Sequence, residues 1–188
     1  MKVILASASE RRQELLVRLC KNFDIMVSDF DEEKVIFQNS IDEYVQNIAL
    51  GKAINIKEKV KDNAIIIAAD TIVTLDDKIL GKPKNEEDAF NMIKLLQGRS
   101  HKVYSGVVVI NTKKDLILKD SVATEVVFSQ MNDDEIREYI KTREPLDKAG
   151  AYGIQGIGGI FVKEIRGCYY NVVGLPLNKL KIMLEKVI

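Results

Sequence analysis

Positively charged side chains recur at three places in the sequence whose surroundings are unusual for surface residues. Arg11 and Arg12 follow the segment LASASE, and Lys52 lies within an apolar helical repeat. Lys82 follows the segment ILG. Arginine presents a planar fork that matches two phosphate oxygens, whereas lysine acts as a point charge. If the fold gathers these residues, they would bind a phosphorylated ligand.

The two arginines stand at the start of a predicted helix. Ser7 and Ser9 lie in the loop before it, and Ser9 is suited to cap its first turn. Free backbone N–H groups at such a start favour an anion, whereas the helix dipole disfavours cations there. We therefore interpret the arginines, with Ser7 and Ser9, as candidates for phosphate binding. Ordinary surface arginines are the open alternative.

Lys52 faces the interior in the predicted arrangement. It lies three and four residues after Ala49 and Ile48, and four before Ile56, on the apolar stripe of a helix over residues 40–60. A buried lysine is costly unless it is paired or binds a ligand. The alternative is that its stem is buried and its ammonium reaches water.

Asp70 follows a continuous apolar run, AIIIAA, at residues 64–69. Such a run predicts a strand buried on both faces, and Asp70 is then expected at its carboxyl end. Open α/β sheets bind ligands at that edge. A turn-forming aspartate before Thr71 is the alternative, and Lys82 alone would be a solvated lysine.

A glycine-rich segment, EPLDKAGAYGIQGIGG, carries Glu144, Asp147, Lys148 and Gln155. Glycines let the backbone approach a ligand closely, and loops often carry function. The segment does not match the dinucleotide-binding pattern GxGxxG. A flexible surface loop is the alternative interpretation.

The composition limits the function classes. Lys plus Arg and Asp plus Glu both number 28, a balance that argues against a large nucleic-acid interface. Two cysteines and one histidine give no zinc spacing, so any metal is expected to be a hard cation such as Mg²⁺. The sequence has no signal-peptide pattern and no apolar run near ~18 residues, and we expect a cytoplasmic protein without membrane contact.

The remaining periodicity predicts an α/β fold, with a mixed sheet flanked by helices, in a single domain over residues 1–188. Strands are expected at residues 3–6, 23–27, 64–69, 101–110, 116–128 and 157–165. Helices are expected at residues 9–20 and 40–60, after the capping residues Asn85 and Asn132, and from Pro176.

Taken together, the segments LASASERRQELL, AADTIV, ILGKPKNEEDA, LQGRSHKVYSGV, EPLDKAGAYGIQG and YYNVVGLPL resemble the Maf-like nucleoside triphosphate pyrophosphatases in order and spacing. The resemblance implies an elongated mixed sheet, a cleft between two lobes, and cleavage between the α and β phosphates. The form DKAGAYGIQG is similar to the branch that prefers dTTP and UTP. A homodimer is compatible with the resemblance.

The resemblance also implies residue roles. Asp70 matches the proposed proton acceptor. The residues that match positions for substrate choice are Arg12, Thr71 and Gln155. Those that match the phosphate and metal region are Ser9, Arg11, Glu32, Lys52, Lys82, Asp147 and Lys148.

An ordinary aspartate has a pKa of ~3.9 and is a weak base at neutral pH. We therefore expect Asp70 to work with a divalent metal, Mg²⁺ before Mn²⁺ or Co²⁺, with Glu32 as the second carboxylate. The rival functions are a purine or inosine-type triphosphate pyrophosphatase and a nucleotide-binding regulator of septum formation.

Overall fold

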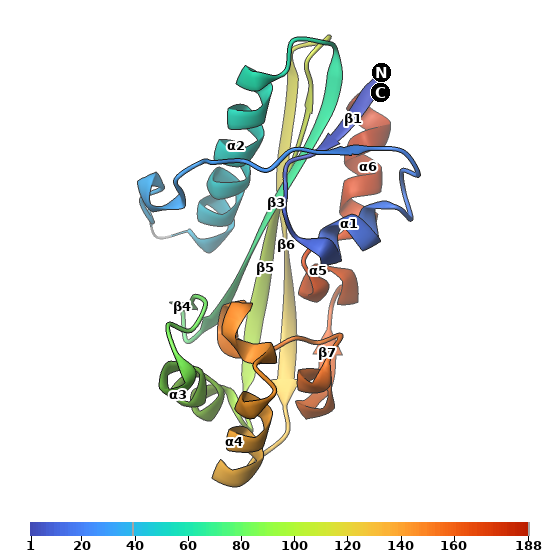
Figure 1. The fold of residues 1–188 in the computed structure, drawn as a ribbon. Coiled ribbons are helices and arrows are strands. Elements are labelled where there is room, and N and C mark those ends of the chain that lie inside the picture. Colours follow the sequence, from blue (N-terminus) through green and yellow to red (C-terminus); the bar gives the residue numbers. More distant parts are fainter. Residues whose placement is uncertain (39, 188) are drawn as a thin grey trace. The chain divides into compact units, whose positions relative to one another are not determined.

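The structure, a computed structural model, describes residues 1–38 and 40–187. Its helices are α1 (Glu10–Leu16), α2 (Ile41–Lys59), α3 (Glu86–Leu96), α4 (Asp133–Lys141), α5 (Tyr169–Val173) and α6 (Leu177–Val187). Its strands are β1 (Lys2–Leu5), β2 (Asp24–Ile25), β3 (Ala64–Leu75), β4 (Lys78–Leu80), β5 (Ser100–Asn111), β6 (Leu116–Phe128) and β7 (Val162–Arg166). Figure 1 shows these elements.

The strands form one mixed sheet in the order β2-β1-β3-β5-β6-β7, with β4 paired to β3. β1 pairs in parallel with β2 and β3, whereas β3–β4 and β6–β7 are antiparallel. The predicted α/β class, a mixed sheet flanked by helices, is confirmed. The chain divides into two compact units, and β3, β5 and β6 contribute residues to both. The single domain over residues 1–188 stays a prediction.

The first unit comprises residues 1–70, 105–122 and 174–188. In it α2 lies on one face of the sheet, and α1 and α6 lie on the other (Figure 1). Ser40 caps α2 through its hydroxyl, which accepts from the backbone N–H of Glu43. The buried side of α2 packs on β1, β3 and β5 through small and β-branched side chains, among them Ala49, Ala53 and Ile56. This packing holds Lys52 close to the sheet.

The second unit comprises residues 71–104 and 123–173. Its core joins α3 and α4 to the strands, and Asn85 and Asn132 cap these two helices as predicted. His101 is buried in that core, where its Nε2 atom lies 2.8 Å from the Tyr152 hydroxyl. Burial lowers the pKa of His101 to about 4, so the ring is neutral at physiological pH.

Two sequence predictions are wrong in detail, and one element was missed. The strand after residue 63 continues to Leu75, because β-branched residues follow Asp70, so Asp70 lies within β3 rather than at its end. Residues 157–161 form a 3₁₀ helix, and β7 begins at Val162. The short helix α5 was not predicted.

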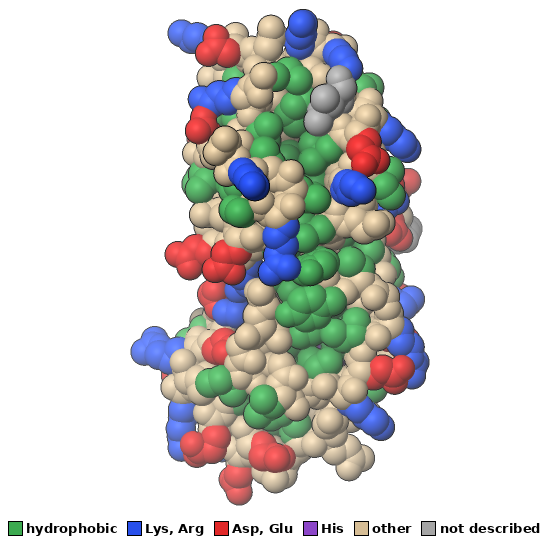
Figure 2. All heavy atoms as spheres, turned by 90° about the vertical axis from the view of Figure 1, so that its right-hand side faces the viewer, with side chains coloured by type: hydrophobic (Ala, Val, Ile, Leu, Met, Phe, Trp, Pro, Cys, Tyr) green, Lys and Arg blue, Asp and Glu red, His purple; other side chains and the backbone are tan. Residues whose placement is uncertain are grey.

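Hydrophobic side chains also reach the surface of the second unit, on the face that carries α5 and β7 (Figure 2). The large exposed apolar residues of this unit include Ile157, Ile160 and Tyr169. Nothing in the described residues shows what would cover these side chains, so we assign them no partner. Among the described residues, no helix is both long and apolar enough to span a bilayer.

Gly106 on β5 allows α2 to approach the sheet closely. A Cβ atom at this position would lie 2.4 Å from the carbonyl oxygen of Val45 and 2.8 Å from the backbone nitrogen of Gln46. Both atoms belong to the backbone of α2, which cannot move aside as a flexible side chain can. The glycine therefore sets the distance between β5 and the helix that carries Lys52.

We expect Gly106→Ala to lower the free energy of unfolding by about 1–3 kcal/mol, because the added methyl overpacks the β5–α2 contact. Urea denaturation followed by circular dichroism measures the loss. Gly81→Ala is the matched control, since an added Cβ there would meet no atom within 4 Å. Equal stability of the two variants would contradict the close approach.

Candidate functional site

A buried ion pair joins α2 to β3. The Lys52 Nζ atom lies 2.6 Å from Asp70 Oδ1 and 2.7 Å from Glu32 Oε1. The Lys52 and Asp70 side chains are 13% and 11% exposed, whereas Glu32 is 54% exposed. The predicted inward position of Lys52 is confirmed, and its ammonium is paired rather than directed to bulk water.

The surroundings of Asp70 depend on where the neighbouring strand β1 ends. β1 pairs with β3 as far as Leu5 opposite Ile67, and the chain then leaves the sheet toward Ser7. Asp70 lies three residues beyond this last pair. The local ending of β1, rather than the end of β3, makes room beside the carboxylate.

The segment that carries Glu32 is fastened to α2. The Phe30 ring packs on Gly51, where a Cβ atom would lie 2.2 Å from the ring. Asn55 on the next turn binds the Ser28 hydroxyl at 3.1 Å and the Asp29 backbone N–H at 3.3 Å. These contacts bring Glu32 to Lys52. The sequence pattern gave no sign of them, because they join a loop to a helix face.

Arg12 lies on the side of α1 that faces Ser7. Its Nε atom donates to the Gly174 carbonyl at 2.9 Å, and its Nη1 atom donates to the Ser7 hydroxyl at 3.4 Å. Burial lowers the pKa of Arg12, while the nearby negative charges of Asp70 and Glu32 act in the opposite direction. The Arg12 guanidinium is therefore close enough to Asp70 and Glu32 for their negative charges to act on it.

The two serines of the preceding loop organise the start of α1. The Ser7 hydroxyl accepts from the Ser9 backbone N–H at 3.2 Å. The Ser9 hydroxyl accepts from the Arg12 backbone N–H at 3.5 Å, which makes Ser9 the predicted helix cap. Arg11 is half-buried in the first turn. The first unit thus brings together Ser7, Arg12, Glu32, Lys52 and Asp70.

The other candidate residues belong to the second unit. Lys148 Nζ donates to the Glu144 carbonyl at 3.0 Å and lies 2.6 Å from Asp147 Oδ1. Gln155 is exposed in the glycine-rich segment. Two further candidates of this unit are the half-buried Thr71 on β3 and the exposed Lys82 after β4.

The sequence did not indicate the hydrogen bonds that two residues of this unit make. Tyr139 was not singled out, and Glu144 was one charge among several in the glycine-rich segment. The Tyr139 hydroxyl donates to Glu144 Oε1 at 2.8 Å, and Glu144 also accepts from two backbone N–H groups. A run of glycines after a carboxylate was the one available signal for this arrangement.

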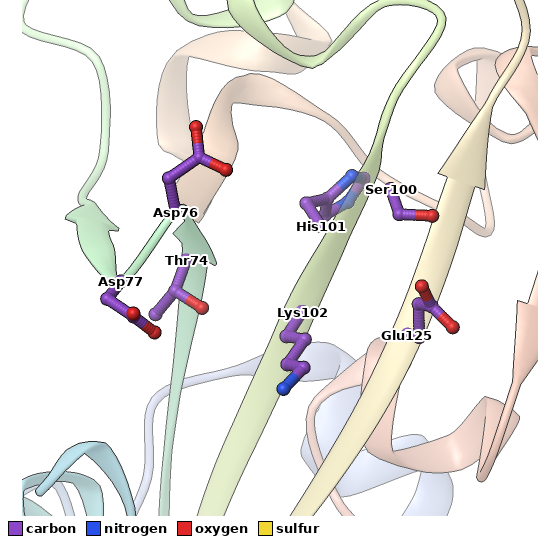
Figure 3. A pocket seen from close by; sticks show the side chains of 7 residues that line it. All are labelled: Thr74, Asp76, Asp77, Ser100, His101, Lys102 and Glu125. Carbon is purple, nitrogen blue, oxygen red and sulfur yellow. The ribbon is translucent and has the colours of Figure 1, made fainter.

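The second unit also contains a pocket of about 240 Å³, and none of the candidate residues lines it. Figure 3 shows its lining, from β3, β5, β6 and the β3–β4 turn. Two of its carboxylates are already paired, Asp76 with Arg99 and Glu125 with Arg166. We do not assign a ligand to this pocket.

The described residues hold no cluster of three or more His, Cys, Asp or Glu side chains suited to a metal. Glu32 and Asp70 are two carboxylates on one ammonium, and a hard cation needs only one or two carboxylates when a nucleotide supplies further oxygens. The donor set therefore fits Mg²⁺ bound together with phosphates.

Comparison with known proteins identifies the family of the chain. Over residues 2–187 the chain matches the family described as Maf-like protein. The chain belongs to the Maf-like family. This Maf-like chain is 88% identical, over 100% of both chains, to a Clostridium botulinum protein named dTTP/UTP pyrophosphatase. It is 74% identical, over 100% of both chains, to a Clostridium beijerinckii protein of the same name.

Among solved structures, the Maf-like chain is similar to a HAM1 protein from Coxiella burnetii. The two are 15% identical, with a TM-score of 0.49, and the match covers 99% of each chain.

We expect Lys52→Met to lower the free energy of unfolding by about 3–5 kcal/mol, because it leaves the buried Asp70 carboxylate without its cation. Glu32→Gln is the matched control on the exposed side of the same ammonium, and it should cost less than about 1 kcal/mol. Urea denaturation measures both.

A second variant separates charge from packing. Lys52→Met combined with Asp70→Asn should recover part of the loss, since no charge then remains unpaired in the interior. If the double variant is as unstable as the sum of its two single changes, the two residues do not interact as an ion pair.

Proposed function

We propose that this Maf-like protein is a nucleoside triphosphate pyrophosphatase that hydrolyses dTTP and UTP to the monophosphate and pyrophosphate. The observation that carries the proposal is the buried Lys52 held between Asp70 and Glu32. Structural lysines are seldom buried in this way, and two carboxylates beside cations suit metal-assisted phosphate chemistry. The names of the 88% and 74% identical relatives support the same substrates.

The triphosphate tail carries several negative charges, and its hydrolysis requires cations around the phosphates. In the proposed site Arg12 provides a fork for two phosphate oxygens, and Lys52 provides a point charge. Ser7 and Ser9 contribute hydroxyls or backbone N–H groups. The further cations assigned to phosphate binding are Arg11, Lys82 and Lys148, with Asp147 orienting the last of these through its 2.6 Å contact.

Asp70 is the proposed proton acceptor. A water molecule attacks the α-phosphorus, its proton passes to the Asp70 carboxylate, and the bond to the bridging oxygen breaks to release pyrophosphate. Lys52 contacts Asp70 directly, so it can stabilise the negative charge on the phosphates while keeping the carboxylate in place.

A divalent cation, Mg²⁺ before Mn²⁺ or Co²⁺, would be held by Glu32 and Asp70 together with the phosphates. When bound, it would neutralise phosphate charge and acidify the attacking water. Glu32 is exposed enough to turn from Lys52 toward such a cation, since more than half of its side chain is open to solvent.

The polar residues proposed to bind the nucleobase of the substrate are Gln155, Thr71 and Arg12. The Gln155 amide has both a donor and an acceptor, which match the edge of uracil or thymine. Sites that hydrogen-bond a substrate discriminate more strongly than apolar pockets do. A cytoplasmic location and a homodimer remain predictions from the sequence.

Pyrophosphate release from dTTP, UTP, CTP, GTP, ITP and 7-methyl-GTP, with and without Mg²⁺, tests the function. We expect turnover of dTTP and UTP that is lost on chelation of the metal. A preference for ITP would favour the purine-type alternative. Binding of a nucleotide without release of pyrophosphate under any of these conditions would favour the regulatory alternative.

We expect Asp70→Asn to lower kcat by about 10²–10⁴-fold, the usual contribution of a general base. The amide keeps the shape and the hydrogen bond from Lys52 but cannot take the proton. Initial rates of UTP hydrolysis measure the effect. Asp115→Asn, at an exposed aspartate paired with Lys57, is the matched control. Near-normal turnover in Asp70→Asn would refute the assigned role.

We expect Gln155→Glu to reduce the preference for UTP over GTP by about tenfold, because a carboxylate cannot donate to a carbonyl of uracil. The ratio of kcat/KM for the two substrates measures this preference. An unchanged ratio would remove Gln155 from the base-binding residues.

A further inference from the structure

Gln155 lies within a tight turn whose two ends are fastened to the protein. The Gly156 backbone N–H donates to the Gly153 carbonyl at 3.3 Å, which closes a four-residue turn with Gln155 in its third position. The Gln155 side chain is exposed, whereas Tyr152 before the turn is buried. The backbone of the turn therefore sets the point and direction from which the Gln155 side chain extends.

The entry to the turn is held by Tyr139 of α4. The Gly153 backbone N–H donates to the Tyr139 hydroxyl at 3.2 Å, and the same hydroxyl donates to Glu144 Oε1 at 2.8 Å. The Tyr139 ring is 2% exposed and packs edge-on against Phe161. A rigid ring thus carries the hydroxyl that joins the turn to the carboxylate.

The exit from the turn is held by Glu144. Its Oε2 atom accepts from the Ile157 backbone N–H at 2.8 Å, and its Oε1 atom accepts from the Gly158 N–H at 3.0 Å. With the Tyr139 hydroxyl, three donors converge on one carboxylate. A carboxylate is the side chain that can satisfy all three, because both of its oxygens accept.

Small residues leave the space that this arrangement requires. A Cβ atom at Gly156 would lie 2.2 Å from Glu144 Oε2, and one at Gly158 would lie 2.4 Å from the Tyr139 hydroxyl. At Gly153 a Cβ atom would lie 2.8 Å from Lys148 Cε. The glycines of the segment therefore allow contact with Glu144, Tyr139 and Lys148 rather than provide flexibility.

The surroundings of Glu144 favour its charged form. Partial burial would raise the pKa of Glu144, but the hydrogen bonds from Gly158, Tyr139 and Ile157 and the charge of Lys148 outweigh that effect. The pKa therefore lies below its ordinary value. Lys148 is held by the same residue, since its ammonium donates to the Glu144 carbonyl.

We propose that Glu144 and Tyr139 are positioning residues that fix the Gln155 turn and thereby set the preference among nucleotide bases. The inference rests on the proposed function, because Gln155 is assigned to the base there. Glu144 and Tyr139 touch no substrate in this scheme and act through the backbone of residues 153–158.

Two conservative variants test the proposal. Glu144→Gln keeps the shape but replaces one accepting oxygen with an NH₂ group, so at least one backbone N–H loses its acceptor. Tyr139→Phe keeps the ring and removes the hydroxyl that holds Gly153. We expect each to lower the ratio of kcat/KM for UTP over GTP by about tenfold, with a smaller change in kcat for UTP. Glu138→Gln, on the exposed side of α4, is the matched control and should leave the ratio unchanged.

A double-mutant cycle distinguishes positioning from a general structural role. In a Gln155→Ala background, Glu144→Gln should cause little further loss of preference, because the residue through which it acts is absent. A uniform fall in kcat for all substrates, with the UTP to GTP ratio preserved, would overturn the proposal.

Hydrogen exchange provides a readout that needs no turnover. Amides of residues 153–158 should exchange faster in Tyr139→Phe and Glu144→Gln, whereas those of α3 should not change. Unchanged exchange in the turn would also overturn the proposal.

Failure of the proposed function would appear differently, as a wild-type protein that releases no pyrophosphate from any triphosphate. In that case the preference is measured as the ratio of affinities for the α,β-methylene analogues of UTP and GTP. Loss of that ratio in the two variants would support the positioning role, and its retention would contradict it.

Discussion

The contact between Lys52 and Asp70 is the constraint on which the first unit depends. Neither charge is stable alone in an interior setting, because desolvation of an unpaired ion costs several kcal/mol. The consecutive elements α2 and β3 must therefore bring Lys52 Nζ within 2.6 Å of Asp70 Oδ1. Gly106 allows α2 to lie close enough to the sheet, and the early end of β1 leaves space beside Asp70. The Phe30 contact with Gly51 then adds Glu32 from a third segment. The ion pair thus links α2, β3 and the segment that carries Glu32.

The second unit positions its polar residues by different physics. Its central group, Glu144, binds the backbone N–H groups of Ile157 and Gly158 rather than a cation, and the missing side chain of Gly156 leaves room for the carboxylate. Charge-assisted hydrogen bonds of this kind are about twice as strong as neutral ones, so they can fix a turn that has little apolar contact of its own. The first unit thus fixes charged side chains through ion pairs, and the second fixes backbone through a carboxylate. Both arrangements hold polar groups in place before a ligand is present.

Much of this could be predicted from the sequence where a signal is local. The spacing around Lys52 predicted its inward position, and Asn85 and Asn132 predicted the starts of two helices. The prediction for Asp70 was wrong about the strand, because a pattern along one segment does not reveal where the neighbouring strand ends. The prediction of a strand over residues 157–161 failed for a similar reason, since the acceptor for that backbone lies more than ten residues away on Glu144. The pairing of Glu32 with Lys52 depends on contacts between a loop and a helix, which periodicity does not record.

The local charge balance bears on how such a site can accept a polyanion. Lys52 and Arg12 offset Asp70 and Glu32, so the four groups together are close to neutral, as is the whole chain. A neutral arrangement avoids the cost of repulsion in the folded protein without ligand. A metal on the carboxylates would cancel their charge and leave the lysine and the arginine for the phosphates. The net charge that the site presents to the phosphates would therefore change, from near zero in the free protein to positive once the cation is bound. This coupling would also favour the metal-bound nucleotide over the nucleotide alone, because each component supplies the charge that the other requires.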